Sequence, residues 1–148
     1  NRDWTLEIVG EGPEEALYRQ LITKHGLEDR VILSPFTRNI QSHYAQSSIY
    51  VLSSRWEGFG LVLIEAMAHS LSIIASDLPV TRELLYGKDV AILFEKENIH
   101  EMARCMSSLA NDPSLISRMG ENAKTYAKEF EMESVIKQWI TNINPSHV

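Results

Sequence analysis

Two glutamates in the middle of the chain have the residue type and the spacing to bind a polar ligand. Glu57 precedes the glycine–aromatic–glycine sequence of residues 58–60, and Glu65 lies eight residues further on, in a run that is otherwise apolar. A buried carboxylate without a partner costs several kcal/mol. The charge in this run therefore predicts either a polar ligand beside Glu65 or a partner elsewhere in the chain.

The elements around the two glutamates predict where such a ligand lies. Residues 49–54 are predicted to form a strand, and residues 60–69 a helix that is buried on most sides. Ligands of open α/β sheets bind beyond the carboxyl ends of the strands. The free N–H groups at the helix start suit a phosphate. Glu65, one turn further on, can accept hydrogen bonds from the two hydroxyls of a ribose, and Glu57 can face a second polyol.

A phosphate, a ribose and a second polyol together describe a nucleotide-sugar. Two simpler interpretations stay open. Glu65 pairs with an arginine such as Arg82 or reaches solvent at the helix edge, and Glu57 is an ordinary loop acid. Because two acids eight residues apart are common, the prediction depends on the whole combination of strand, acid, glycine–aromatic–glycine and apolar helix.

Strand-like and helix-like segments alternate along the whole chain, which predicts an α/β fold with a parallel sheet covered by helices on both faces. Asn98 with Glu101 resembles a capping box, and Asp112 followed by Pro113 restarts a helix. The predicted strands are residues 4–10, 30–35, 49–54, 71–76 and 90–95, and the predicted helices are 12–26, 39–47, 60–69, 81–86, 98–110 and 112–143, the last with a break near 130–133.

Composition argues against several classes of protein. The net charge of -6 over 148 residues disfavours binding to nucleic acid or to anionic membranes. No apolar run approaches the ~18 residues of a membrane span. The chain opens on a strand-like pattern without a signal peptide, so we expect a cytoplasmic protein and a fragment of a larger one. Cys105 is the single cysteine and the five histidines are scattered, so neither a disulfide nor a metal site is predicted.

Residues 53–83, with the two glutamates in the spacing E-x(7)-E, resemble the donor site of retaining GT-B-fold glycosyltransferases, the glycosyl transferases group 1 family. The likeness extends from about residue 4 to residue 109. It implies a Rossmann-like fold, the C-terminal half of a two-domain enzyme, with residues 1–148 as one truncated nucleotide-sugar-binding domain. It also implies that residues 131–143 cross to an N-terminal acceptor-binding domain, which this chain lacks.

The same resemblance assigns roles to individual residues. Glu65 binds the ribose hydroxyls, and Glu57, the catalytic residue, positions a hydroxyl of the donor sugar. No metal or other cofactor is implied, because helix N–H groups and basic side chains stabilise the diphosphate. The remaining donor-binding positions are Gly58, Phe59 and Gly60 near the sugar, Leu61 and Val62 at the distal phosphate, and Pro35 and Phe36 against the base.

The chain departs from the family pattern at several positions. Residues 70–72 are Ser-Leu-Ser where the family usually has Gly-hydrophobic-Pro, and Ala91 replaces a frequent glycine. A preceding strand and helix, with the arginine and lysine that bind the diphosphate, are also missing. We therefore expect the strand of residues 4–10 to pair with that of residues 49–54, or the sheet to be completed from elsewhere. We also expect this fragment alone to be inactive.

The resemblance implies an enzyme that transfers a sugar from a nucleotide-diphosphate-sugar to a saccharide or lipid-linked acceptor, in polysaccharide or glycoconjugate synthesis. Contact with the inner membrane face is expected only through the full enzyme. The alternatives are a non-catalytic nucleotide-sugar-binding module and a GT-B-fold nucleotide-sugar epimerase.

Two aromatic positions keep two interpretations each. Trp56 either stacks on a sugar or anchors its loop in the core. The apolar stripe of Ile136, Trp139 and Ile140 either packs on its own domain or faces the partner domain.

Overall fold

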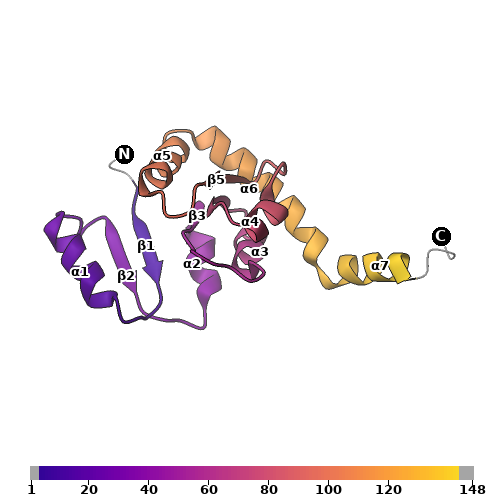
Figure 1. Ribbon diagram of the computed structural model, residues 1–148, viewed down its shortest axis with the longest axis horizontal. Helices are drawn as coiled ribbons and strands as arrows, with labels where there is room; N and C mark the ends of the chain where they lie inside the picture. Colours follow the sequence, from indigo (N-terminus) through magenta and orange to yellow (C-terminus); the bar gives the residue numbers. More distant parts are fainter. Residues whose placement is uncertain (1–3, 144–148) are drawn as a thin grey trace. The chain divides into compact units, whose positions relative to one another are not determined.

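The computed structural model describes residues 4–143, and their contacts divide the chain into two units, the first ending at His43 and the second beginning at Tyr44 (Figure 1). Both units are built from parallel strands and helices. The α/β class with parallel sheets flanked by helices is therefore confirmed. One domain across residues 1–148 stays a prediction.

The first unit contains one strand–helix–strand repeat. Strand β1 (Leu6–Val9) is followed by helix α1 (Glu15–Lys24) and strand β2 (Val31–Ser34), and the two strands pair in parallel. Helix α1 has no buried residue, because it covers a sheet of only two strands. The carboxylate of Glu7 accepts a hydrogen bond from the Ser34 hydroxyl, and its Oε2 lies 3.0 Å from Nδ1 of His43.

The second unit contains a three-stranded parallel sheet in the order β3-β4-β5. Helix α2 crosses the boundary between the two units. The elements from that boundary onward are α2 (Ile40–Gln46), β3 (Ile49–Leu52), α3 (Leu61–Ala68), β4 (Ser72–Ser76), α4 (Pro79–Leu85), β5 (Ala91–Phe94), α5 (Ile99–Ala110), α6 (Pro113–Ala127), the 3-10 turn η1 (Lys128–Phe130) and α7 (Met132–Ile143).

The core of the second unit lies around the central strand β4, all of whose residues are buried. One cluster joins Ile74 of β4 and Phe94 of β5 to Leu109 of α5 and Met119 of α6. Helix α3 adds Leu63 and Met67, both with no exposed surface. Burial on this scale, at roughly 25 cal/mol per Å² of apolar surface, fixes the helices on the sheet and so positions the loops at its carboxyl edge.

Within the first unit β1 pairs with β2, and within the second unit β3 pairs with β4. The predicted pairing of the strand of residues 4–10 with that of residues 49–54 joins the two units and stays a prediction. Within each unit, paired strands are neighbours along the chain and are joined by a short helical connection, the commonest arrangement for such units. Completion of the sheet from elsewhere stays a prediction.

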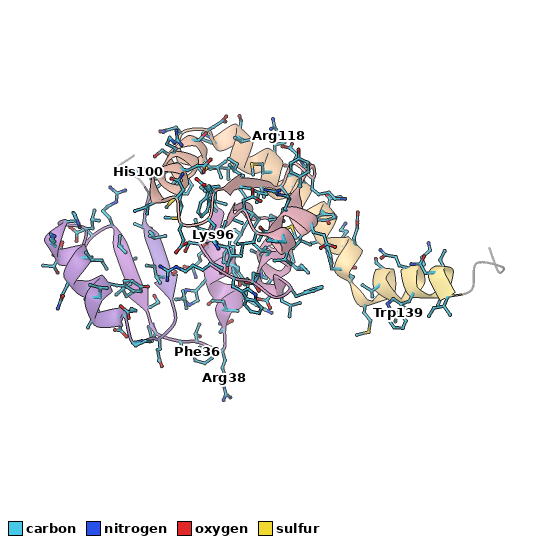
Figure 2. The ribbon with its side chains drawn as sticks, viewed as in Figure 1. Phe36, Arg38, Lys96, His100, Arg118 and Trp139 are labelled. Atoms are coloured by element: carbon cyan, nitrogen blue, oxygen red, sulfur yellow. The ribbon has the colours of Figure 1, made fainter. Side chains whose placement is uncertain are left out.

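The predicted break before the last helix is confirmed. Glu131 has an extended conformation (φ -64°, ψ 147°) between η1 and α7. Helix α7 buries no residue, and Ile136, Trp139 and Ile140 are 51–67% exposed (Figure 2). The interpretation in which this stripe packs on its own domain is therefore wrong for the described residues. Among those residues no helix has the length and apolar character required to cross a membrane.

Candidate functional site

The loop between β3 and α3 is folded around the side chain of Glu57. Its Oε1 accepts hydrogen bonds from the backbone N–H groups of Gly58, at 3.0 Å, and Gly60, at 3.3 Å. The carboxylate therefore has a structural partner in its own loop, directly before the first turn of α3. Both of these bonds use Oε1, so Oε2 remains to accept a bond from a ligand hydroxyl.

Gly60 is required at the start of α3 for two reasons. Its φ of 81° lies in the left-handed region, which side chains other than glycine disfavour. A methyl group placed there would lie 3.2 Å from Cδ1 of Leu63 and 3.6 Å from Cδ2 of Leu84. The residue lets the chain turn sharply from the loop into the helix, and the helix start stays open at Leu61 and Val62.

The prediction that α3 is buried on most sides is wrong. The helix buries Leu63, Ala66 and Met67, whereas Leu61 and Glu65 lie on an exposed face. The segment is apolar enough to be buried, but only one side of it meets the sheet and α6. The interpretation in which Glu65 reaches solvent is confirmed.

Glu65 has a partner that the sequence did not indicate. The hydroxyl of Tyr44 donates to its Oε2 at 3.2 Å, and the Tyr44 ring contacts Tyr50 and His69, with centroids 5.8 and 5.3 Å away. The alternative partner Arg82 is wrong, because its guanidinium is paired with Asp77, with Nε 2.9 Å from Oδ1. No motif marks Tyr44, since a contact across 21 residues leaves no pattern in the sequence.

Besides burial, the charges of Glu65 and Glu57 both raise the pKa of one tyrosine, Tyr50. Burial raises the pKa of Tyr50 above its ordinary value, and the charges of Glu65 and Glu57 raise it further. Burial likewise raises the pKa of Tyr44, with smaller contributions from Tyr50 and Glu65. Both phenols therefore stay protonated at neutral pH, and Tyr44 is a permanent donor to Glu65. The Glu57 loop leads directly into α3, which carries Glu65 in its second turn.

The predicted donor-binding residues divide between the two units. Glu57 to Val62 and Glu65 lie on the second unit, where Phe59 is 61% and Leu61 63% exposed. Pro35 and Phe36 follow β2 in the first unit, and Phe36 is 66% exposed (Figure 2). The structure thus brings the loop and α3 residues together, and it leaves these positions accessible except for Gly60, which is buried.

An ion pair that the sequence does not indicate joins two loops at the carboxyl edge of the sheet. Nε of Arg55, on the loop after β3, lies 2.8 Å from Oε1 of Glu97, on the loop after β5. Both side chains are more than half exposed, so the pair contributes little stability. It holds the one arginine of the Glu57 loop toward Glu97.

In the part of the chain that the structure describes, the candidate site coincides neither with a metal-binding group of side chains nor with the hollow along β5 and α4. In residues 4–143 no group of three or more His, Cys, Asp or Glu side chains could hold a metal ion. An open hollow of about 650 Å³ lies along β5 and α4, lined by residues such as Arg82, Tyr86 and Ile92 and by none of the predicted site residues. We assign no donor-binding role to this hollow, because neither Glu57 nor Glu65 lines it.

Comparison with known proteins identifies the family. The family model of the glycosyl transferases group 1 matches residues 1–126, and the chain belongs to this family. An uncharacterized glycosyltransferase of Haemophilus influenzae is 37% identical over 138 residues, which is 93% of this chain and 39% of that protein.

Two solved structures share the fold. TarM of S. aureus, crystallised with fondaparinux, alpha-GlcNAc-glycerol and UDP, superposes with a TM-score of 0.82 at 27% identity, over 93% of this chain and 28% of that one. HepE of Anabaena, crystallised with UDP-glucose, superposes with a TM-score of 0.80 at 25% identity, over 96% of this chain and 41% of that one. The chain therefore spans well under half the length of these relatives.

Proposed function

We propose that this chain is the donor-binding part of a retaining glycosyltransferase, which transfers a sugar from a nucleotide-diphosphate-sugar to a saccharide or lipid-linked acceptor when intact. The observation that carries the proposal is the arrangement of Glu57, the glycine loop and Glu65 around the open start of α3. Membership of the group 1 family and the UDP and UDP-glucose complexes of similar proteins support it.

Glu65 is placed to bind a ribose. One of its oxygens accepts from Tyr44, which fixes the orientation of the carboxylate, and its exposed face of α3 is open to a ligand. A carboxylate accepts strong, charge-assisted hydrogen bonds from two adjacent hydroxyls. The exposure of Glu65 means that its charge is solvated without a ligand, so the chain needs no ligand to fold.

Glu57 positions the donor sugar through the oxygen that its loop does not use. Bonding of Oε1 to Gly58 and Gly60 keeps the loop folded, and Oε2 accepts from a hydroxyl of the sugar. The N–H groups of Leu61 and Val62, at the positive end of the α3 dipole, stabilise the distal phosphate as the bond to the sugar breaks. This chemistry needs no metal ion.

The isolated chain is expected to bind a donor without transferring its sugar. These 148 residues span only 28–41% of the length of the relatives compared above, and Arg55, the arginine of the Glu57 loop, is paired with Glu97. Sugar transfer by these 148 residues alone would contradict this part of the proposal.

The test is a thermal-shift panel of UDP-, GDP- and ADP-sugars on the wild-type chain and on Glu65→Ala. We expect one nucleotide class to raise the melting temperature of the wild type, by the mass action of ligand binding to the native state, and a much smaller rise in the variant. The matched control is Glu121→Ala, an exposed helical glutamate of α6. Equal shifts in both variants, or no shift with any nucleotide-sugar, would contradict the proposal.

The retaining mechanism needs the intact enzyme. Product analysis by NMR is expected to show that the sugar keeps the anomeric configuration that it had in the donor. Release of an epimerised sugar without transfer would favour the epimerase alternative.

A further inference from the structure

Trp56 is the most exposed large apolar residue among those that the structure describes. It lies directly before Glu57, and 81% of its surface is open to solvent. Tryptophan buries much apolar area when it packs, so leaving an indole in water is costly. The interpretation in which Trp56 anchors its loop in the core is therefore wrong.

The indole is nevertheless held in place by its own loop. A methyl group placed on Gly58 would lie 3.4 Å from Cη2 and 3.9 Å from Cζ3 of Trp56, so the six-membered ring lies over the bare Cα of this glycine. Because Glu57 bonds to the N–H groups on either side of Phe59, the backbone under the ring is fixed. Two atoms at the edge of the six-membered ring lie beside the loop, while most of the indole is exposed.

We infer that Trp56 is a stacking platform for a pyranose ring at the donor-binding loop, and this inference rests on the proposed function. The ring C–H groups of a sugar form a flat apolar face that packs on an indole, and its hydroxyls need carboxylate acceptors alongside. An exposed indole next to the carboxylate of Glu57 supplies both. The combination selects a neutral sugar ring and not a second phosphate, which the adjacent carboxylate of Glu57 repels.

The sugar on the platform can belong to the donor or to the acceptor, since both offer the same apolar face. Trp56 adjoins Glu57, the residue that the proposed function assigns to a sugar hydroxyl, whereas the phosphate is assigned to the start of α3. Replacement of Trp56 is therefore expected to affect the contribution of the sugar to binding and not that of the nucleotide.

The first experiment compares nucleotide with nucleotide-sugar affinity by calorimetry, using UDP and UDP-glucose, GDP and GDP-mannose, and ADP and ADP-glucose. For a donor sugar, Trp56→Ala is expected to weaken the nucleotide-sugar by about fivefold and to leave the nucleoside diphosphate unchanged, while Trp56→Phe keeps most of the affinity. An equal loss for both ligands would overturn the inference, because it would indicate a structural role. Because Trp56 is exposed, both variants are expected to fold, and a melting curve checks this.

The second experiment reads the indole directly. In the Trp4→Phe/Trp139→Phe background Trp56 is the only tryptophan, so its fluorescence reports ring contact. A change with nucleotide-sugar but not with nucleotide indicates the donor sugar, and a change with methyl glucoside, methyl mannoside or methyl N-acetylglucosaminide alone indicates an acceptor sugar. If glycosides change the emission but no nucleotide-sugar binds, the platform stands and the proposed function fails. No change with any sugar overturns the platform.

Discussion

The packing of α6 against the end of α3 makes Gly120→Ala an informative substitution. Gly120 is buried in α6, and a methyl group placed on it would lie 2.3 Å from the backbone oxygen and 3.3 Å from the carbonyl carbon of Ser70. Ser70 follows the last turn of α3 with φ 63°, a conformation that leaves its backbone little freedom to shift. The contact fixes the C-terminal end of the helix that carries Glu65.

Two opposing effects decide the magnitude. Alanine in a helix interior is favoured over glycine by about 1 kcal/mol. Overpacking of a dense core typically costs about 1–3 kcal/mol, and a backbone obstacle places this site at the upper end. We therefore expect Gly120→Ala to lower the free energy of unfolding by about 2 kcal/mol, or the melting temperature by roughly 4–8 °C for a domain of this size.

Urea unfolding followed by circular dichroism measures this change, with an unchanged m-value showing that stability alone has altered. The control is Gly12→Ala, where the added methyl group meets nothing within 4 Å, and which should stay within about 0.5 kcal/mol of the wild type. A Gly120→Ala protein as stable as the wild type, or more stable, would refute the close packing of α6 on Ser70.

Three further substitutions test other parts of the structure. Thr81→Val removes a buried hydroxyl that accepts from the Leu78 N–H at 2.9 Å, and should lower the unfolding free energy by about 2 kcal/mol. Thr81→Ser keeps the hydroxyl and should keep most of this stability, so equal stability of the two variants would contradict the role of the hydrogen bond. Hydrogen bonds from Ser34 and His43 lower the pKa of Glu7. The wild type should therefore be more stable than Glu7→Gln, fully so above pH 4.5, and this difference in unfolding free energy should disappear as the pH falls through the lowered pKa. A difference that persists in acid unfolding would contradict the direction of the shift. Ile140→Asp should leave the melting temperature of this chain unchanged because α7 buries no residue, and should destabilise the intact protein if residues 131–143 pack on another domain there.

Local signals in the sequence predicted the elements well because those elements are locally determined. Asn98 caps α5 by accepting from the Glu101 N–H at 3.0 Å, and Asp112 caps α6 by accepting from the Leu115 N–H at 3.0 Å. The capping box is only half formed, however, since the Glu101 carboxylate accepts from the Glu95 N–H at 2.8 Å. The side chain of the third helical residue has two backbone donors within reach, and the sequence does not rank them.

Relations between distant segments were predicted less well. The burial of α3 depends on how much of the helix meets the sheet and α6, which composition does not reveal, so the prediction of a helix buried on most sides is wrong. The bond from Tyr44 to Glu65 joins α2 to α3 across strand β3, and strand pairing likewise depends on which edges meet. Residue type and spacing identified the acids; only the structure supplied the tyrosine that orients one of them.

The central claim, that Glu65 holds the ribose of a nucleotide, is tested most directly by a double-mutant cycle between protein and ligand. Calorimetry gives the dissociation constants of the best-binding nucleoside diphosphate and of its 2′-deoxy form for the wild type and for Glu65→Ala. A hydrogen bond to a charged group contributes about 1.5–3 kcal/mol, so we predict that the 2′-deoxy form binds the wild type at least about tenfold more weakly, and that Glu65→Ala binds both forms equally. A 2′-deoxy penalty that persists undiminished in Glu65→Ala would contradict the account.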